Sequence, residues 1–210
     1  MLIKDNSNLN DVTFFNWETT FDATVLIDDC IYPNTYNVNL SFLPKSTDIQ
    51  LQNNSFDRLK YLFGNLCENS LIINPETKLQ AVFFQMPINK VLLPGKPYDQ
   101  LFCYVLYHKM IAISGKYLHI GHLTVDSKLG DNVQYSVDEK TINNITLPDE
   151  NWISPVITQP WWDRNDTATF DQVLGEKEFW TGPKGWRDLG YGSDAPKKSF
   201  NPTILDGGRD

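Results

Sequence analysis

The sequence has few of the residues that build disulfide frameworks, zinc sites or membrane spans. Cysteine occurs three times in 210 residues, at Cys30, Cys67 and Cys103, and never with Cys-x-x-Cys spacing. An odd cysteine count without that spacing argues against a disulfide framework and against a zinc site. No apolar run approaches the ~20 residues of a membrane-spanning helix, and residues 1–10 lack the apolar centre of a signal peptide. We therefore expect no metal, no other cofactor and no membrane partner.

Positive charge is also scarce. The chain has 18 Lys and Arg against 26 Asp and Glu, which gives a net charge of −8. Binding to the phosphates of DNA or RNA needs Lys and Arg, and the main adjacent basic pair is Lys197-Lys198. The charge argues against nucleic acid as the partner and is typical of a soluble surface.

Signatures of common enzyme classes are missing or out of context. There is no Gly-x-Ser-x-Gly motif, no P-loop and no Rossmann glycine fingerprint. His119-Ile120-Gly121-His122 spells the adenylate-transfer signature of class I aminoacyl-tRNA synthetases, but the Rossmann-type strands and helices that this signature needs are not predicted around it. On a regular strand the two imidazoles would face opposite sides, and only a bulge at Gly121 would bring them together. We expect no catalytic residues and a non-enzymatic protein.

Periodic hydrophobicity is concentrated between residues 21 and 140. Strand patterns cover residues 21–27, 35–43, 71–73, 81–86, 117–126 and 133–137, and helical patterns cover residues 46–69 and 97–113. The central order, strand-helix-strand-strand-helix-strand, predicts an α+β fold of the ferredoxin-like βαββαβ type. Two helices would cover one face of an antiparallel sheet, residues 21–27 would extend an edge, and Asn37, Asn39 and Ser41 would lie on the open polar face.

The ends of the chain differ from this central part. We predict an N-terminal arm over residues 1–20, a domain over 21–140, and an extended C-terminal arm over 141–210 that is rich in Trp, Pro and Gly. Exposed aromatic side chains are frequent anchors at protein interfaces. The predicted partner-binding residues are Trp152, Trp161, Trp162, Trp180, Trp186 and Tyr191. The alternative is that these side chains fold back and cover their own sheet.

Three segments, at residues 52–61 (QNNSFDRLKY), 97–100 (PYDQ) and 111–118 (IAISGKYL), resemble an uncharacterised family of small proteins from contractile-tailed bacteriophages. The resemblance covers residues 35–165 at most, includes a Trp-bearing tail such as Trp161-Trp162, and carries over no active site. It implies a phage origin and a virion or host-takeover role, without choosing between them. The Trp-rich arm favours a structural or assembly protein in the host cytoplasm or the virion, whose arm contacts other protein chains, either copies of itself or virion proteins. The alternative is a small nucleic-acid-binding or host-takeover regulator that uses the open face of the sheet.

Overall fold

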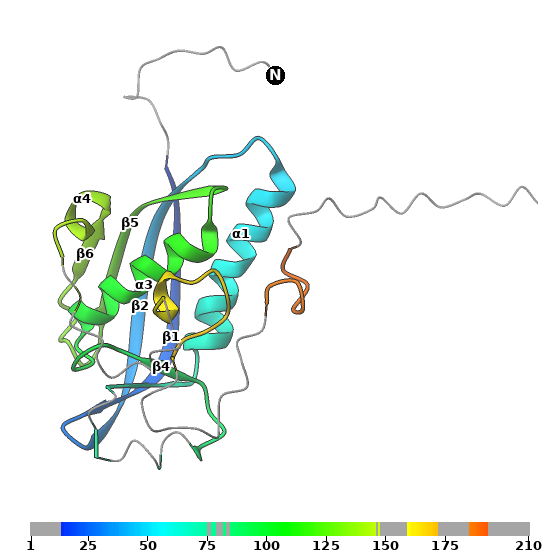
Figure 1. Ribbon diagram of the computed structural model, residues 1–210. Helices are drawn as coiled ribbons and strands as arrows, with labels where there is room; N and C mark the ends of the chain where they lie inside the picture. The colour runs from blue at the N-terminus through cyan, green and yellow to red at the C-terminus, as the bar shows by residue number, and fades with distance from the viewer. Residues whose placement is uncertain are drawn as a thin grey trace, which may run out of the picture.

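A computed structural model describes residues 14–74, 77–78, 82, 85–145, 147, 159–171 and 185–192. It shows a mixed α+β fold with a six-stranded sheet in the order β4-β3-β1-β2-β5-β6. Helices α1 and α3 lie against one face of this sheet (Figure 1). The elements are β1 (Phe15–Ile27), β2 (Cys30–Pro44), α1 (Ile49–Tyr61), the π-helical turn η2 (Leu62–Cys67), β3 (Ser70–Ile73), β4 (Lys90–Leu92), α3 (Asp99–Ser114), β5 (Leu118–Ser127), β6 (Tyr135–Asp138), α4 (Glu139–Ile142) and the 3₁₀ turn η3 (Trp161–Asp163).

A long antiparallel hairpin of β1 and β2 forms the centre of the sheet. Its two turn residues, Asp28 and Asp29, both have positive φ angles, of 50° and 62°. This is the backbone that a two-residue type I′ turn requires, and its twist matches that of the strands. The prediction that residues 21–27 extend an edge of the sheet is wrong, because these residues belong to β1, which pairs with β2 on one side and with β3 on the other. Residues 15–20 also belong to β1 rather than to an N-terminal arm, since they pair with residues 37–42.

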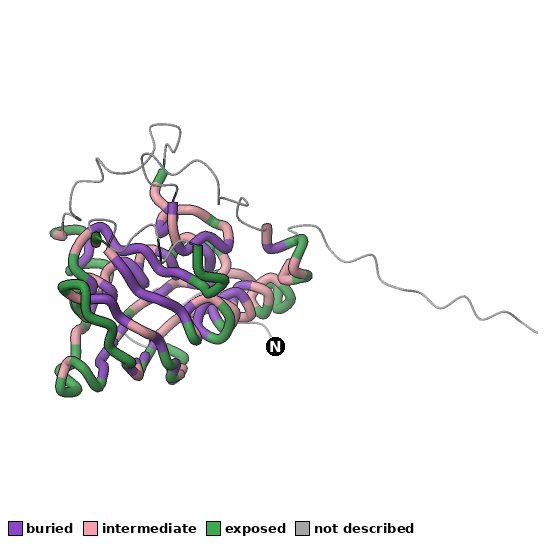
Figure 2. The backbone as a smooth tube through the Cα atoms, turned by 90° about the horizontal axis from the view of Figure 1, so that it is seen from below, coloured by how far each residue is buried: buried purple, intermediate pink, exposed green. Residues whose placement is uncertain are grey.

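Period-two alternation separates the core face of the hairpin from its polar face. Phe21, Val25, Tyr36 and Leu40 are buried under the helices, whereas Asn37 and its polar neighbours are exposed. Buried stretches accordingly gather where strands and helices meet (Figure 2). The core is rich in aromatic contacts that join strands to helices, such as the edge contact between Tyr36 and Phe102 of α3, with ring centroids 4.9 Å apart.

Helix α1 begins at a side-chain cap and α3 is enclosed. The Asp48 carboxylate accepts hydrogen bonds from the backbone N–H groups of Gln50 and Leu51, at 2.9 and 3.2 Å, which satisfies two of the amides that a helix start leaves unpaired. Helix α3 is buried around most of its circumference, as its apolar pattern predicts. No helix within the described residues is long and apolar enough to cross a membrane.

The ferredoxin-like arrangement is not confirmed. Two paired strands, β1 and β2, precede α1, and β3 is parallel to both β1 and β4. The return strand predicted at residues 81–86 is not seen in the described part of that range, where Val82 and Gln85 are helical. Residues 81, 83 and 84 lie outside the described residues. Residues 74–89 instead connect two parallel strands, and a parallel pair needs a crossover of a dozen or more residues rather than a hairpin loop.

Candidate functional site

The C-terminal Trp pair lies in the protein core. Trp161 and Trp162, in the turn η3, have exposed fractions of 0% and 1%. Their rings meet edge to face, with centroids 5.6 Å apart. The Trp161 indole Nε1 donates a hydrogen bond to the Leu92 carbonyl oxygen of β4, at 2.8 Å. The turn therefore joins α3 and the β4 edge of the sheet, and it completes their packing.

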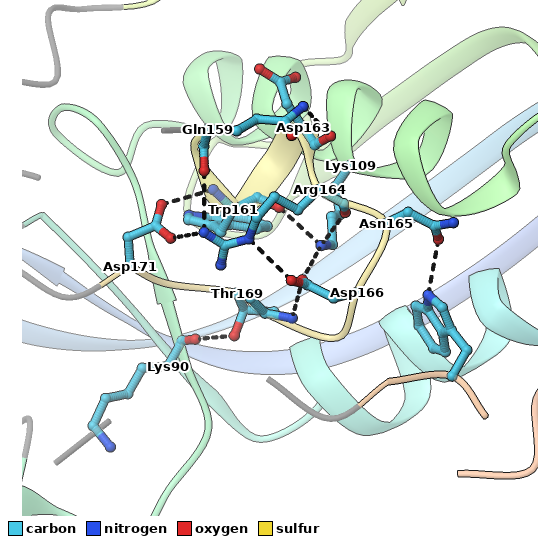
Figure 3. Close-up of polar contacts among 12 residues, drawn as sticks. Lys90, Lys109, Gln159, Trp161, Asp163, Arg164, Asn165, Asp166, Thr169 and Asp171 are labelled. Carbon is cyan, nitrogen blue, oxygen red and sulfur yellow. Dashed lines mark hydrogen bonds and ion pairs between the residues drawn. The ribbon is translucent and has the colours of Figure 1, made fainter. Parts of the chain in front are cut away.

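A buried lysine on α3 holds this segment in place. The Lys109 ammonium is fully buried and donates to the carbonyl oxygens of Trp161 and Arg164, both at 2.9 Å, and to Asp166 Oδ1 at 3.3 Å (Figure 3). Burial lowers the pKa of Lys109 to about 8, against the opposing effect of the Asp166 carboxylate. A buried charge is tolerated only when it is paired and hydrogen-bonded. The burial of Lys109 therefore depends on the acceptors of this segment, and the position of the segment depends on Lys109.

Two carboxylates and a guanidinium extend the network on the other side of η3. Arg164 Nε donates to Asp166 at 3.0 Å and Arg164 also pairs with Asp171, whose second oxygen accepts from the Trp161 backbone N–H at 2.7 Å. Burial raises the pKa of Asp171, while Arg164 acts in the opposite direction. Beyond this network, the Leu92 N–H donates to the Thr169 carbonyl at 2.9 Å, which covers the outer edge of β4. We call residues 159–171 the C-terminal clasp.

A second C-terminal segment, residues 185–192, contacts α1. Trp186 is buried, with its indole N–H donating to Asn165 Oδ1 at 3.1 Å and its ring beneath the Arg58 guanidinium. Arg58 also donates to the Tyr191 carbonyl at 3.1 Å, and the Tyr61 ring contacts both aromatic side chains.

The predicted partner-binding residues thus divide into two groups. Trp161, Trp162 and Trp186 are buried in the chain's own core, and Tyr191 is half-buried against α1. For these four residues the structure shows the alternative, in which the aromatic side chains cover their own domain. Trp152 and Trp180 lie outside the described residues.

The open face of the sheet carries a ladder of polar pairs across β1, β2 and β5. Side-chain hydrogen bonds join Ser41 to Asn16 at 2.6 Å, Asn39 to Glu18 at 3.0 Å, Thr35 to Asp22 at 2.7 Å and Asn37 to Asp126 at 2.7 Å. Three of these pairs contain a carboxylate. Such a face attracts neither phosphate nor other anions.

The two imidazoles of the His119–His122 motif lie on the same side of β5. Ser41 pairs with His122 and Phe42 pairs with Ile120, so Gly121 is an extra residue that forms a β-bulge. The bulge turns both His119 and His122 to the open face, because Ile120 and Leu123 remain in the core. The Phe14 ring packs against Gly121, where a Cβ atom would overlap it. No group of three or more His, Cys, Asp or Glu side chains that could hold a metal occurs among the described residues.

The N-terminal half of β1 forms a sheet edge that no other strand of the described residues covers. β1 pairs with β3 only at residues 23–25, so residues 15–22 have no strand on that side in the described part of the chain. Beside this edge, Phe15 is 56% exposed and stacks on Phe42, with centroids 6.0 Å apart. Phe42 in turn stacks on Phe56 of α1, at 5.3 Å. We call residues 15–22 the β1 edge; it is the candidate contact surface.

Comparison with solved structures gives distant likenesses. No family model matches the chain, and no curated protein matches it. A solved structure of a catalytic-residue mutant of 6-pyruvoyltetrahydropterin synthase from Plasmodium vivax is similar over 60% of this chain and 98% of that chain, with 9% identity and a TM-score of 0.39. At this score the likeness assigns neither a fold family nor an activity.

Proposed function

We propose that this chain is a non-enzymatic structural or assembly protein of a bacteriophage, and that it acts by pairing the β1 edge with the same edge of a second copy. The observation that carries the proposal is that residues 15–21 of the β1 edge have no pairing strand among the described residues, and that exposed aromatic rings, Phe14 and Phe15, lie at its start. Exposed strand edges present unpaired N–H and C=O groups, and proteins use them to add strands from other chains.

The hairpin register identifies which backbone groups are free. Because Ile27 and Cys30 flank a two-residue turn, they form a hydrogen-bonded pair, and such pairs alternate with non-bonded pairs along the hairpin. The N–H and C=O groups of Asn16, Glu18 and Thr20 therefore point away from β2. Consistent with this alternation, the carbonyl oxygen of Asp22 accepts a hydrogen bond from Asn69 on that outer side, at 2.7 Å.

The phage origin rests on the resemblance of residues 52–61, 97–100 and 111–118 to phage proteins, and the proposed locations are the host cytoplasm and the virion. We assign the contact surface to the β1 edge rather than to the C-terminal arm, because the described Trp side chains of that arm are buried. A nucleic-acid regulator that uses the open face has less support, since Glu18, Asp22 and Asp126 lie on that face.

The test is a single proline on the edge. Thr20→Pro removes an outward N–H group and leaves the β1–β2 hydrogen bonds intact, because edge strands accept proline where the N–H faces outward. Thr20→Val is the matched control, since it keeps the N–H group and the β-branched shape. In analytical ultracentrifugation we expect the full-length protein and Thr20→Val to associate with increasing concentration, and Thr20→Pro to remain monomeric.

Two results would contradict the proposal. One is a full-length protein that stays monomeric at every accessible concentration. The other is a Thr20→Pro variant that keeps its native circular dichroism spectrum and associates as strongly as Thr20→Val.

A further inference from the structure

A cavity of about 170 Å³ opens where the last residues of β1, the start of α3 and the turn after β5 meet. Its lining is mostly apolar or aromatic and includes Ile27, Tyr98, Leu129 and Tyr135. Asp99 carries the one charge among the described residues that line it, since none of them is a Lys, Arg, His or Glu. The cavity therefore combines an apolar wall with a single carboxylate.

The turn after β5 holds this carboxylate at the wall of the cavity. The Ser127 hydroxyl donates a hydrogen bond to Asp99 Oδ2 at 2.6 Å, and the same hydroxyl oxygen accepts from the Gly130 N–H at 3.1 Å. Gly130 also lines the cavity, and a Cβ atom there would overlap Asp99 Oδ2. Asp99 is half-buried rather than enclosed, so a bound molecule can reach the carboxylate from the cavity.

No cation among the described residues that line the cavity balances the charge of Asp99. Burial raises the pKa of Asp99, the Ser127 hydrogen bond lowers it, and the Asp126 carboxylate raises it further. Lys96, the lysine nearest to Asp99 in the sequence, pairs instead with Asp28 in the hairpin turn, at 2.8 Å. A carboxylate in partly apolar surroundings is stabilised by a cationic partner, and the dipole at the start of α3 supplies only a partial charge. The cavity therefore favours a positively charged group.

We propose that this cavity binds a small organic ammonium ion, with the ammonium group at Asp99 and the apolar stem against Ile27 and Leu129. Tyr98 and Tyr135 add aromatic surface, which also attracts organic cations. An anion is excluded because Asp99 would repel it, and a hydrocarbon would leave the carboxylate without a partner. The size suits a stem of one ring or a short chain, since a cavity of about 150 Å³ holds a benzene molecule.

The test compares two probes that differ in charge. At neutral pH 4-fluorobenzylamine carries an ammonium group, and 4-fluorobenzyl alcohol has nearly the same shape without the charge. In fluorine NMR with the full-length protein, we expect the amine to bind about three- to tenfold more tightly than the alcohol.

Two variants locate the charge that the amine recognises. Asp99→Asn keeps an oxygen that can accept from Ser127 and removes the charge, so it should abolish the preference for the amine. Asp131→Asn is the matched control, because it removes an equal charge from the same turn. Asp131 is exposed and does not line the cavity, so this change should leave the preference intact.

A competition step identifies the source of the ammonium group. Nα-acetyl-lysine methylamide presents a lysine side chain without any other charge. If it displaces 4-fluorobenzylamine, the cavity accepts a lysine of a protein chain. If it does not, the cavity selects a free amine whose stem is a ring.

Several results would overturn the inference. Equal affinity for the amine and the alcohol, or no binding of either, would do so without any variant. An unchanged preference in Asp99→Asn would show that Asp99 does not hold the ammonium group. An equal loss in Asp131→Asn would show general attraction to a chain of net charge −8. Sedimentation of Asp99→Asn should match that of the unmodified protein, so this test stands apart from association through the β1 edge.

Discussion

At the scale of single residues, Lys109 is the side chain on which the C-terminal half of the core depends. It lies on a helix whose other inward residues are mostly apolar, and its acceptors come from a segment about fifty residues further along the chain. The sequence contained a signal for this arrangement, because a lysine in a helix that is apolar around most of its circumference needs a buried partner. The spacing could not show that the partners would be backbone carbonyls of the turn at Trp161.

Replacing Lys109 with methionine should strongly destabilise the protein. Lys109→Met keeps the length of the side chain but removes the ammonium hydrogen bonds to the carbonyl oxygens of Trp161 and Arg164 and to the Asp166 carboxylate. We expect a loss of about 2–4 kcal/mol in the free energy of unfolding, measured by urea denaturation. The control is Lys60→Met on α1, which removes an exposed i,i+3 pair with Asp57 and should have little effect. Similar losses in the two variants would contradict a special role for Lys109.

The same lysine should make stability depend on alkaline pH. The pKa of Lys109 is about 8 in the folded protein, against an ordinary value of 10.5. Between these values the unfolded chain binds a proton that the folded chain does not, so the contribution of Lys109 to stability increases as the pH rises. The difference in unfolding free energy between the unmodified protein and Lys109→Met should therefore grow between about pH 7 and about pH 10. A constant or shrinking difference would show that the folded pKa is not lowered.

At the scale of elements, the alternation of apolar and polar residues predicted which face of a strand is buried but not which strands pair with each other. The strands at residues 35–43 and 117–126, the polar face of the first of them and both long helices were predicted correctly, because side-chain periodicity follows directly from burial. Periodicity says nothing about which strand pairs with which. Residues 21–27 lie inside the sheet, where β1 pairs with β3. The second partner of β3 is β4, whose three residues give too short a pattern to detect.

The bulge in β5 should depend on the absence of a side chain at Gly121. Gly121→Ala places a Cβ atom where the Phe14 ring lies, so we expect the ring to be displaced and the protein to lose about 1–2 kcal/mol of stability. Phe14→Ala in the same chain removes the clash. In a double-mutant cycle measured by denaturation, the alanine at position 121 should therefore cost less when Phe14 is absent. Additive effects would show that the ring does not pack there.

At the scale of the whole molecule, the C-terminal clasp belongs to the core. The sequence predicted an arm over residues 141–210, because proline and glycine break the periodic pattern there. Burial of Trp161, Trp162 and Trp186 does not require a helix or a strand; it requires only that the rings reach an apolar surface, which α1 and α3 provide.

Two truncations should separate the clasp from the rest of the C-terminal region. A chain that ends at residue 147 loses the clasp, so α3 and the Lys109 ammonium lose their cover. We expect it to aggregate or to lack a cooperative thermal transition. A chain that ends at residue 192 keeps both described segments and should melt close to the full-length protein. A cooperative, equally stable transition in the shorter chain would contradict a structural role for the clasp.

The position of the clasp has a consequence for synthesis on the ribosome. Chains fold from the N-terminus as they emerge, so α3 is made well before the carbonyl groups that accept hydrogen bonds from Lys109. Until residues 161–166 emerge, the nascent chain carries an apolar helix with a lysine that has no buried acceptor, and the native core cannot close. An interrupted translation product therefore stays open to proteases and chaperones, whereas a chain translated past the clasp can close its core.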